Sequence, residues 1–230
     1  MPDFTRAEFL TFDCYGTLID WENGILSALR PIVVARDKKS SDAELLELYG
    51  DLEMEAESGP YQTYRDVLQS VVRGVGKRLN FTPTNDEVRS LPDSLKGWQP
   101  FPDTVEALRR LAERYKLVIL SNVDDDLFAH SQRKLKVQFY DVITAQQAQC
   151  YKPALGIFKL ALQRLKAPIE SVVHVGQSIY HDVIPARSLG LETVWVNRPS
   201  PRPNAGATKR ANAKPDLEVS SLRALADVAT

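Results

Sequence analysis

Hydrophobic positions along the chain fall into two patterns. Short apolar runs, rich in β-branched and aromatic residues, are typical of buried strands; they occupy residues 9–12, 116–120, 140–143, 171–175 and 192–196. Between them, apolar residues recur at helical spacing, as in residues 103–112 and 157–165. Strands that alternate with helices indicate βαβ units. The sequence therefore predicts an α/β fold with a parallel sheet, which residues 216–219 and a short helix from Ser220 complete.

The stretch from about Trp21 to Leu95 breaks this alternation. It contains helical patterns at residues 25–34, 43–57 and 61–79 but no convincing strand. We therefore expect an all-helical cap at residues 21–95, inserted after the first strand of a core made of residues 1–20 and 96–230. Such a cap can close over a site and exclude water.

Composition and charge narrow the classes of partner. The chain has 230 residues, of which 43% are hydrophobic, and a formal net charge of -1. This charge gives no electrostatic reason to expect nucleic acid or an anionic membrane as a partner. No apolar run approaches the roughly 20 residues of a spanning helix, the first residues lack the apolar core of a secretory signal, and two cysteines imply no disulfide framework. We expect a cytoplasmic protein that acts on a small molecule, with a homodimer left open.

Four polar segments follow apolar runs or lie close behind them. Their polar residues are Asp13 and Thr17, Ser121 and Asn122, Lys152, and Gln177, Ser178 and Asp182. In open α/β sheets, ligands bind outside the carboxyl ends of the strands, so these side chains are expected to converge. Asp13 alone is better explained as a turn residue that accepts hydrogen bonds. Together with an ammonium and a second carboxylate, it is suited to covalent catalysis by an aspartate nucleophile.

Other polar residues have structural explanations. Asp124, Asp125 and Asp126 stand at an expected helix start, where carboxylates satisfy free N–H groups and the helix dipole. His174 lies inside an apolar run and is expected to be a packing residue.

In order and approximate spacing, the four segments resemble the motifs of the haloacid dehalogenase (HAD) superfamily, from about residue 9 to residue 198. The resemblance implies a Rossmann-like core, a helical cap and an aspartyl ester intermediate. It implies that Asp13 is the nucleophile and that Thr17 orients it.

The resemblance also assigns roles to the later segments. Ser121 and Asn122 would hold the substrate, and Lys152 would neutralise the nucleophile and the developing charge. Asp182 would pair with Lys152 or position the hydrolytic water. Gln177 and Ser178, beside Asp182, join the expected substrate-binding set.

Two positions separate the subfamilies. Phosphatases of this superfamily carry a second Asp two residues after the nucleophile as the general acid, whereas this chain has Tyr15, which cannot easily do that at neutral pH. Tyr15 resembles the 2-haloacid dehalogenases, in which halide leaves as an anion. Gln177 is neutral where phosphatases usually offer an acidic ligand to Mg²⁺. The leading prediction is hydrolytic dehalogenation of a small 2-haloacid without a cofactor, with Tyr15 among the substrate-binding residues.

One departure keeps alternatives open. The dehalogenases usually place an Arg early in the cap, but residues 48–53 contain none and are acidic. Arg65 could substitute if its helix faces the site, and an exposed surface Arg is an equally good interpretation. The alternatives are a Mg²⁺-dependent phosphatase acting on a small phosphate ester, with the ion at Asp13, Tyr15 and Asp182, and a non-catalytic binding protein of the same fold.

Overall fold

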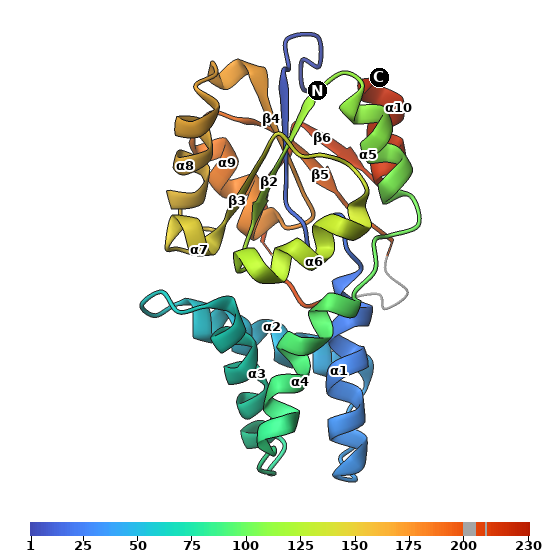
Figure 1. Cartoon of the computed structure of the whole chain (residues 1–230), viewed down its shortest axis with the longest axis vertical. Coiled ribbons are helices and arrows are strands. Elements are labelled where there is room, and N and C mark those ends of the chain that lie inside the picture. The colour runs from blue at the N-terminus through green and yellow to red at the C-terminus, as the bar shows by residue number, and fades with distance from the viewer. Residues whose placement is uncertain (200–205, 210) are drawn as a thin grey trace.

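The structure is a computed structural model that describes residues 1–199, 206–209 and 211–230. It consists of an α/β core and a helical cap that lies against one end of that core (Figure 1). The fold class predicted from the sequence is confirmed.

A six-stranded sheet forms the centre of the core, in the order β3-β2-β1-β4-β5-β6. Every neighbouring pair is parallel. The strands are β1 (Phe9–Phe12), β2 (Lys116–Ser121), β3 (Asp141–Thr144), β4 (Val172–Gly176), β5 (Glu192–Val196) and β6 (Leu217–Val219). All four residues of β1 and all five of β4 are buried, as continuous apolar runs predict for strands covered on both faces. The carboxyl ends of β1, β2 and β4 lie side by side.

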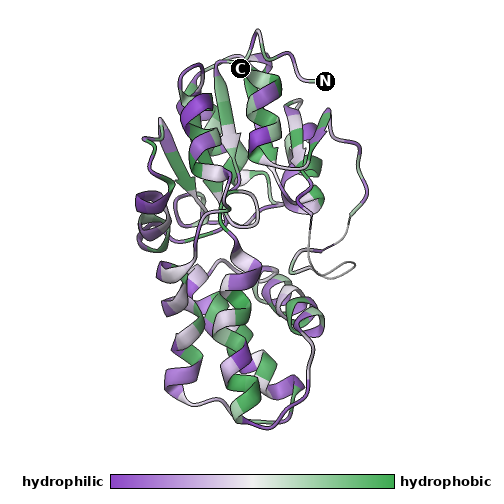
Figure 2. Cartoon of the chain, turned by 90° about the vertical axis from the view of Figure 1, so that its right-hand side faces the viewer, coloured by the Kyte–Doolittle hydropathy of each residue, from purple (hydrophilic) through white to green (hydrophobic). Residues whose placement is uncertain are grey.

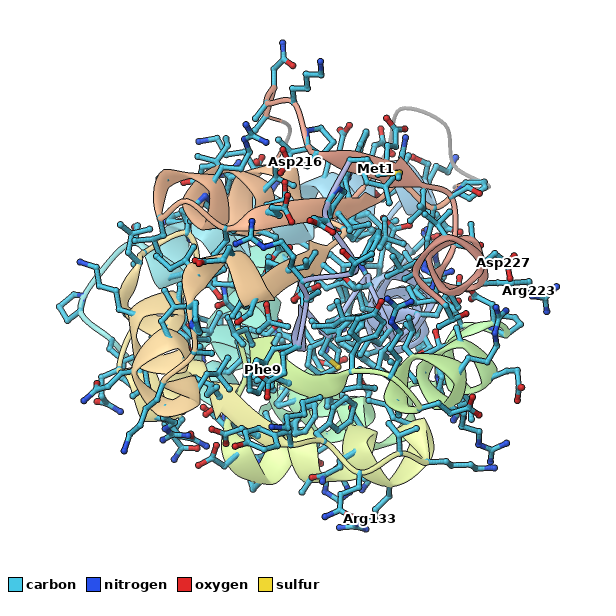
Figure 3. All side chains as sticks on the ribbon, turned by 90° about the horizontal axis from the view of Figure 1, so that it is seen from above. Met1, Phe9, Arg133, Asp216, Arg223 and Asp227 are labelled. Carbon is cyan, nitrogen blue, oxygen red and sulfur yellow. The ribbon has the colours of Figure 1, made fainter. Side chains whose placement is uncertain are left out.

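Helices cover both faces of the sheet. One face packs against α5 (Thr104–Ala112) and α10 (Leu222–Ala229), and the other against α7 (Ala145–Ala148), α8 (Gly156–Leu165) and α9 (Ile184–Ser188) (Figure 1). The α8 face buries Ile157, Phe158 and Ala161 against β2 and β3. Seen from above, charged side chains such as Arg133, Arg223 and Asp227 lie at the outer rim (Figure 3).

The remaining core elements are α6 (Asp125–Leu135) and three short helical turns, η1 (Leu95–Gly97), η2 (Ile169–Ser171) and η3 (Ile179–Val183). Lys134 of α6 donates hydrogen bonds to the carbonyl oxygens of Lys96 (2.6 Å) and Trp98 (2.5 Å). This contact ties the carboxyl end of the sheet to the chain that returns from the cap.

Four helices make up the cap, namely α1 (Trp21–Ala35), α2 (Asp42–Glu57), α3 (Tyr64–Arg78) and α4 (Asn85–Ser94). Their hydrophobic faces turn towards one another and their polar faces outwards (Figure 2). Helix α4 was not expected from the sequence, because Pro92 interrupts its helical pattern. Its start carries a capping box between Thr84 and Glu87, which is the local signal that identifies it. Among the described residues, no helix is long and apolar enough to cross a membrane.

Candidate active site

Asp13 directly follows β1, and its carboxylate is held in place by a sharp turn. Its own N–H donates to the carbonyl of Val175 on β4 (2.9 Å). Gly16 then adopts a φ of 92°, which favours glycine. The turn brings Thr17 back, so that its hydroxyl donates to Asp13 Oδ2 at 2.6 Å. The N–H of Gln177 donates in turn to Thr17 Oγ1 at 2.9 Å, which fixes the direction of the Thr17 hydroxyl.

Lys152 lies between the two carboxylates of the site. Its Nζ is 2.9 Å from Asp13 Oδ1 and 2.7 Å from Asp182 Oδ1, and it also donates to the carbonyl of Leu120 at 3.0 Å. Only 2% of the lysine is exposed. Burial opposes its charge, but Asp13 and Asp182 outweigh that effect and raise the pKa of Lys152 above its usual value. The ammonium therefore stays charged.

The two carboxylates differ in their proton affinity. Burial opposes ionisation of Asp182, but Lys152 and a hydrogen bond from His174 outweigh it and lower the pKa of Asp182. Burial raises the pKa of Asp13 and the charge of Asp182 adds to this, against the opposing effects of Lys152 and Thr17. Asp13 is therefore the carboxylate that takes a proton first as the pH falls.

Asp182 is packed closely against β4. A Cβ on Gly176 would lie 2.5 Å from Asp182 Cγ, so only glycine admits the carboxylate at this position. The N–H of Ser178 donates to Asp182 Oδ2 at 3.2 Å. His174 Nε2 is 3.2 Å from Asp182 Oδ1, and its Nδ1 is 2.9 Å from Thr11 Oγ1.

His174 is thus a positioning residue, whereas its place within an apolar run predicted a packing role. The sequence does carry a signal for this role, since His174 is a polar residue within a buried apolar run. A buried polar side chain requires a hydrogen-bonding partner.

Tyr15 contributes a wall to the site. Its hydroxyl is 3.0 Å from Ser131 Oγ, and its ring meets that of Trp98 edge-on with centroids 5.7 Å apart. Burial raises the pKa of Tyr15 well above its usual value. A phenol that is buried, bonded elsewhere and hard to ionise is not a general acid for a leaving alcohol.

A small pocket lies between core and cap, with a cavity volume of about 40 Å³. Core residues predicted from the sequence line it, namely Asp13, Tyr15, Ser121, Asn122, Lys152, Gln177, Ser178 and Asp182. The other lining residues, which the sequence did not predict as site residues, are Trp21, Glu53, Glu57, Tyr64, His181 and Thr208. Burial, with a smaller contribution from Lys152, lowers the pKa of His181 to about 4 against the opposing effect of Asp182, so this imidazole is neutral at pH 7.

Ser121 and Asn122 differ in what they bond. The Ser121 hydroxyl is buried and has no hydrogen-bond partner within the described part of the chain. Because buried hydroxyls are rarely left unpaired, it is available to a ligand in the pocket. The Asn122 amide accepts from the N–H of Lys152 (2.7 Å) and donates to the carbonyl of Lys152 (3.1 Å).

Arg65 does not line the pocket, which corrects the expectation that it replaces the missing cap Arg. Its guanidinium pairs with Asp126 at 2.7 Å and with Asp93 at 3.7 Å, and its side chain is 37% exposed. The reason is the orientation of α3, which presents Tyr64 to the pocket.

Asp124 holds this helix onto the core. Its carboxylate accepts from the N–H groups of Tyr64 (2.9 Å) and Arg65 (3.0 Å). It therefore caps the first turn of α3 in the cap, whereas the sequence suggested that it serves the start of its own helix.

The cap wall of the pocket is acidic. Tyr49 and Tyr64 each donate a 2.6 Å hydrogen bond to Glu53 Oε1. Burial raises the pKa of Glu53 to about 7. Glu57, one turn further along α2, is half-buried; burial and the charge of Glu53 raise its pKa well above the usual range. The spacing of four residues on one helix face is the signal that relates Tyr49, Glu53 and Glu57.

The carboxylates of the site are paired with an ammonium group. Within residues 1–199, 206–209 and 211–230, no three His, Cys, Asp or Glu side chains are grouped so that they could hold a metal. Asp13 and Asp182 share the Lys152 ammonium, and the Tyr15 hydroxyl is bonded to Ser131. Mg²⁺ is usually held by one or two carboxylates together with waters and substrate oxygens, so an ion here would compete with Lys152 for Asp13 and Asp182.

Comparison with known proteins gives a consistent family. A model described as haloacid dehalogenase-like hydrolase matches residues 9–190. The chain is 26% identical to the (S)-2-haloacid dehalogenase of Pseudomonas sp. (strain YL) over 227 residues, which cover 95% of this chain and 93% of that protein. It is 34% identical to the glyceraldehyde 3-phosphate phosphatase of Methanocaldococcus jannaschii over 104 residues, or 43% of this chain and 44% of that protein.

The fold has close structural neighbours. The L-2-haloacid dehalogenase from Xanthobacter autotrophicus superposes with a TM-score of 0.81 at 20% identity, over 96% of this chain and 98% of that chain. At this identity the likeness shows a common fold.

Proposed function

Because the chain belongs to the haloacid dehalogenase-like hydrolases, we propose that it hydrolyses the carbon–halogen bond of a small 2-haloacid through an ester formed on Asp13. The observation that supports this proposal most strongly is that the Lys152 ammonium lies between Asp13 and Asp182. Beside it, Tyr15 stands in place of a general acid. This arrangement supplies a fixed positive charge and a buried nucleophile, and a halide leaves without needing a proton.

The first step forms one bond and breaks one bond. An oxygen of Asp13 attacks the halogenated carbon, and the halogen leaves as halide with both electrons of its bond. Thr17 holds the second carboxylate oxygen of Asp13, so that the attacking group is oriented before the substrate arrives. The unpaired Ser121 hydroxyl donates to the substrate carboxylate. Lys152 offsets the repulsion between that carboxylate and Asp13.

The second step hydrolyses the ester and regenerates the free enzyme. Water attacks the carbonyl carbon of the Asp13 ester, and Lys152 stabilises the negative charge that develops on the carbonyl oxygen. Asp182 orients the water. Collapse releases the 2-hydroxyacid and the Asp13 carboxylate, and one proton passes to solvent. The balance is haloacid plus water to hydroxyacid, halide and a proton, with no metal required.

A second candidate is a Mg²⁺-dependent phosphatase, which is favoured by the likeness of 43% of the chain to a phosphatase. Two parts of that chemistry are missing here, because Tyr15 stands at the general-acid position and Gln177 at a metal-ligand position. Positioning and charge neutralisation carry most of phosphoryl transfer, so the two losses compound.

One panel separates these candidates. Halide release from chloroacetate and 2-chloropropanoate, and phenolate release from p-nitrophenyl phosphate, are measured with EDTA and with Mg²⁺. The proposal predicts EDTA-resistant chloride release and poor phosphatase activity. Strong Mg²⁺-dependent phosphatase activity that is lost in Asp182→Asn would overturn it, and no turnover in any arm would favour a non-catalytic binding protein.

A further inference from the structure

The pocket has two walls of opposite chemistry. The core wall offers the positive charge of the Lys152 ammonium and the unpaired hydroxyl of Ser121 as a donor. The cap wall offers acceptors, the carboxyl groups of Glu53 and Glu57 on α2. A substrate that bears only a carboxylate is complementary to the core wall alone.

The acidic groups of the cap wall form no ion pair within the described residues, and the charge of Lys152 only partly offsets the raised pKa of Glu57. Lys152 is the only Lys or Arg among the described residues that line the pocket, and its donors are taken by Asp13, Asp182 and the Leu120 carbonyl. Glu57 forms no hydrogen bond or ion pair within the described ranges. Burying a carboxylate without a counter-charge is costly. The raised pKa values of Glu53 and Glu57 express this cost.

Aromatic rings frame the same wall. Trp21 and Tyr64 line the pocket beside the two glutamates, and both are largely buried. The Tyr64 hydroxyl donates to Glu53 and thereby fixes the direction of that carboxyl. Aromatic faces next to carboxylates are the surroundings that proteins use to bind an ammonium group.

We propose that the cap wall binds an ammonium group of the substrate, with Glu57 and Glu53 as its acceptors. This inference rests on the proposed function and refines its substrate class from a simple 2-haloacid to a small 2-halo acid that also carries an amino group. The carboxylate of that zwitterion faces Ser121 and Lys152, and its ammonium faces α2. The small pocket favours a compact molecule of this kind. 3-Amino-2-chloropropanoate is the simplest member of the class.

Two hydrolysis products give a matched pair of probes. Lactate and isoserine (3-amino-2-hydroxypropanoate) differ only in the ammonium group, and neither depends on turnover. Their dissociation constants are measured by NMR titration of the wild-type protein at pH 7.5 and low salt. We expect isoserine to bind about tenfold more tightly than lactate, which corresponds to about 1.4 kcal/mol. Equal binding, or tighter binding of lactate, would overturn the proposal.

Variants of α2 locate the effect. Glu57→Gln should remove most of the preference for isoserine and leave lactate binding unchanged or stronger. The matched control is Glu55→Gln, an exposed position on the same helix, which should leave both affinities unchanged. A full isoserine preference in Glu57→Gln would place the selectivity elsewhere and contradict the assignment.

Turnover separates this inference from the reaction on which it rests. Chloride release is compared for 2-chloropropanoate and 3-amino-2-chloropropanoate, with Asp13→Asn as the blank for spontaneous release. A higher kcat/KM for the amino compound supports both the proposed reaction and the ammonium site. If isoserine binds more tightly than lactate but neither chlorinated compound releases chloride, the proposed reaction is refuted and the ammonium site stands. If both chlorinated compounds release chloride with equal kcat/KM, the proposed reaction stands and the ammonium site is refuted.

Discussion

The side-chain amide of Asn122 forms two hydrogen bonds with the main chain of Lys152, accepting from its N–H at 2.7 Å and donating to its carbonyl at 3.1 Å. These bonds join the end of β2 to the segment that carries the lysine. The resemblance to known dehalogenases assigned Asn122 to the substrate. The structure shows that its amide also fixes the main chain from which the ammonium reaches Asp13.

Replacing Lys152 should nearly abolish turnover. In Lys152→Ala, the buried Asp13 and Asp182 face each other without a counter-charge, and the ester carbonyl loses its electrostatic partner. We expect kcat/KM to fall by at least about a hundredfold, or about 3 kcal/mol in transition-state stabilisation. The exposed Lys159→Ala is the control. Steady-state kinetics that show near-wild-type rates in Lys152→Ala would assign the lysine a structural role only.

Asn122 and Lys152 should act as one unit. If the amide works mainly by positioning the lysine, Asn122→Ala lowers kcat in the wild type but has little further effect in the Lys152→Ala background. A double-mutant cycle on kcat/KM measures this coupling. Additive losses would mean that Asn122 acts on the substrate independently of Lys152.

His174 should influence catalysis through Asp182. Its hydrogen bond helps to keep the Asp182 carboxylate ionised, so removing the bond raises the pKa of that carboxyl. We expect His174→Phe to lower kcat about tenfold with little change in KM, because Asp182 then holds Lys152 and the hydrolytic water less firmly. His174→Gln, which retains a side-chain donor, should recover part of the loss. A kcat in His174→Phe equal to that of the wild type would show that the imidazole serves packing alone.

Glu53 should make stability depend on pH. Its native pKa of about 7 lies above the ordinary value of 4.5, so the native state keeps a proton that the unfolded chain releases. The free energy of unfolding therefore falls as the pH rises from about 4.5 to about 7 and is unaffected by this group above that range. Urea denaturation of wild type and Glu53→Gln at several pH values tests this. The stability difference should move in favour of Glu53→Gln up to about pH 7 and then stay constant; a difference independent of pH would refute the raised pKa.

Much of the fold and of the core side of the site was predictable because local sequence signals specify them. The strand ends are marked by apolar runs that stop at Asp13 and Ser121, and parallel topology brings such ends together. Asp182 lies soon after β4 and fits the same rule, whereas Lys152 lies beyond both β3 and α7 and was identified through the family resemblance. The cap wall was harder, because Glu53 and Glu57 lie on a helix whose rotation towards the core depends on long-range packing. The prediction that Arg65 faces the site was wrong for the same reason. Asp124 caps α3 in an orientation that turns the Arg65 guanidinium towards Asp126 and Asp93.

The central claim is that Asp13 itself forms the ester, and isotope transfer from water tests it most directly. Wild-type protein is incubated in H₂¹⁸O with excess 2-chloropropanoate, or with the amino compound if only that is turned over, and the peptide containing Asp13 is analysed by mass spectrometry. We predict that ¹⁸O enters the Asp13 carboxylate over many turnovers, and that a single turnover with enzyme in excess yields product without ¹⁸O in the new hydroxyl. A product labelled in its first turnover, with Asp13 unlabelled throughout, would mean that water attacks the substrate directly and would contradict the account.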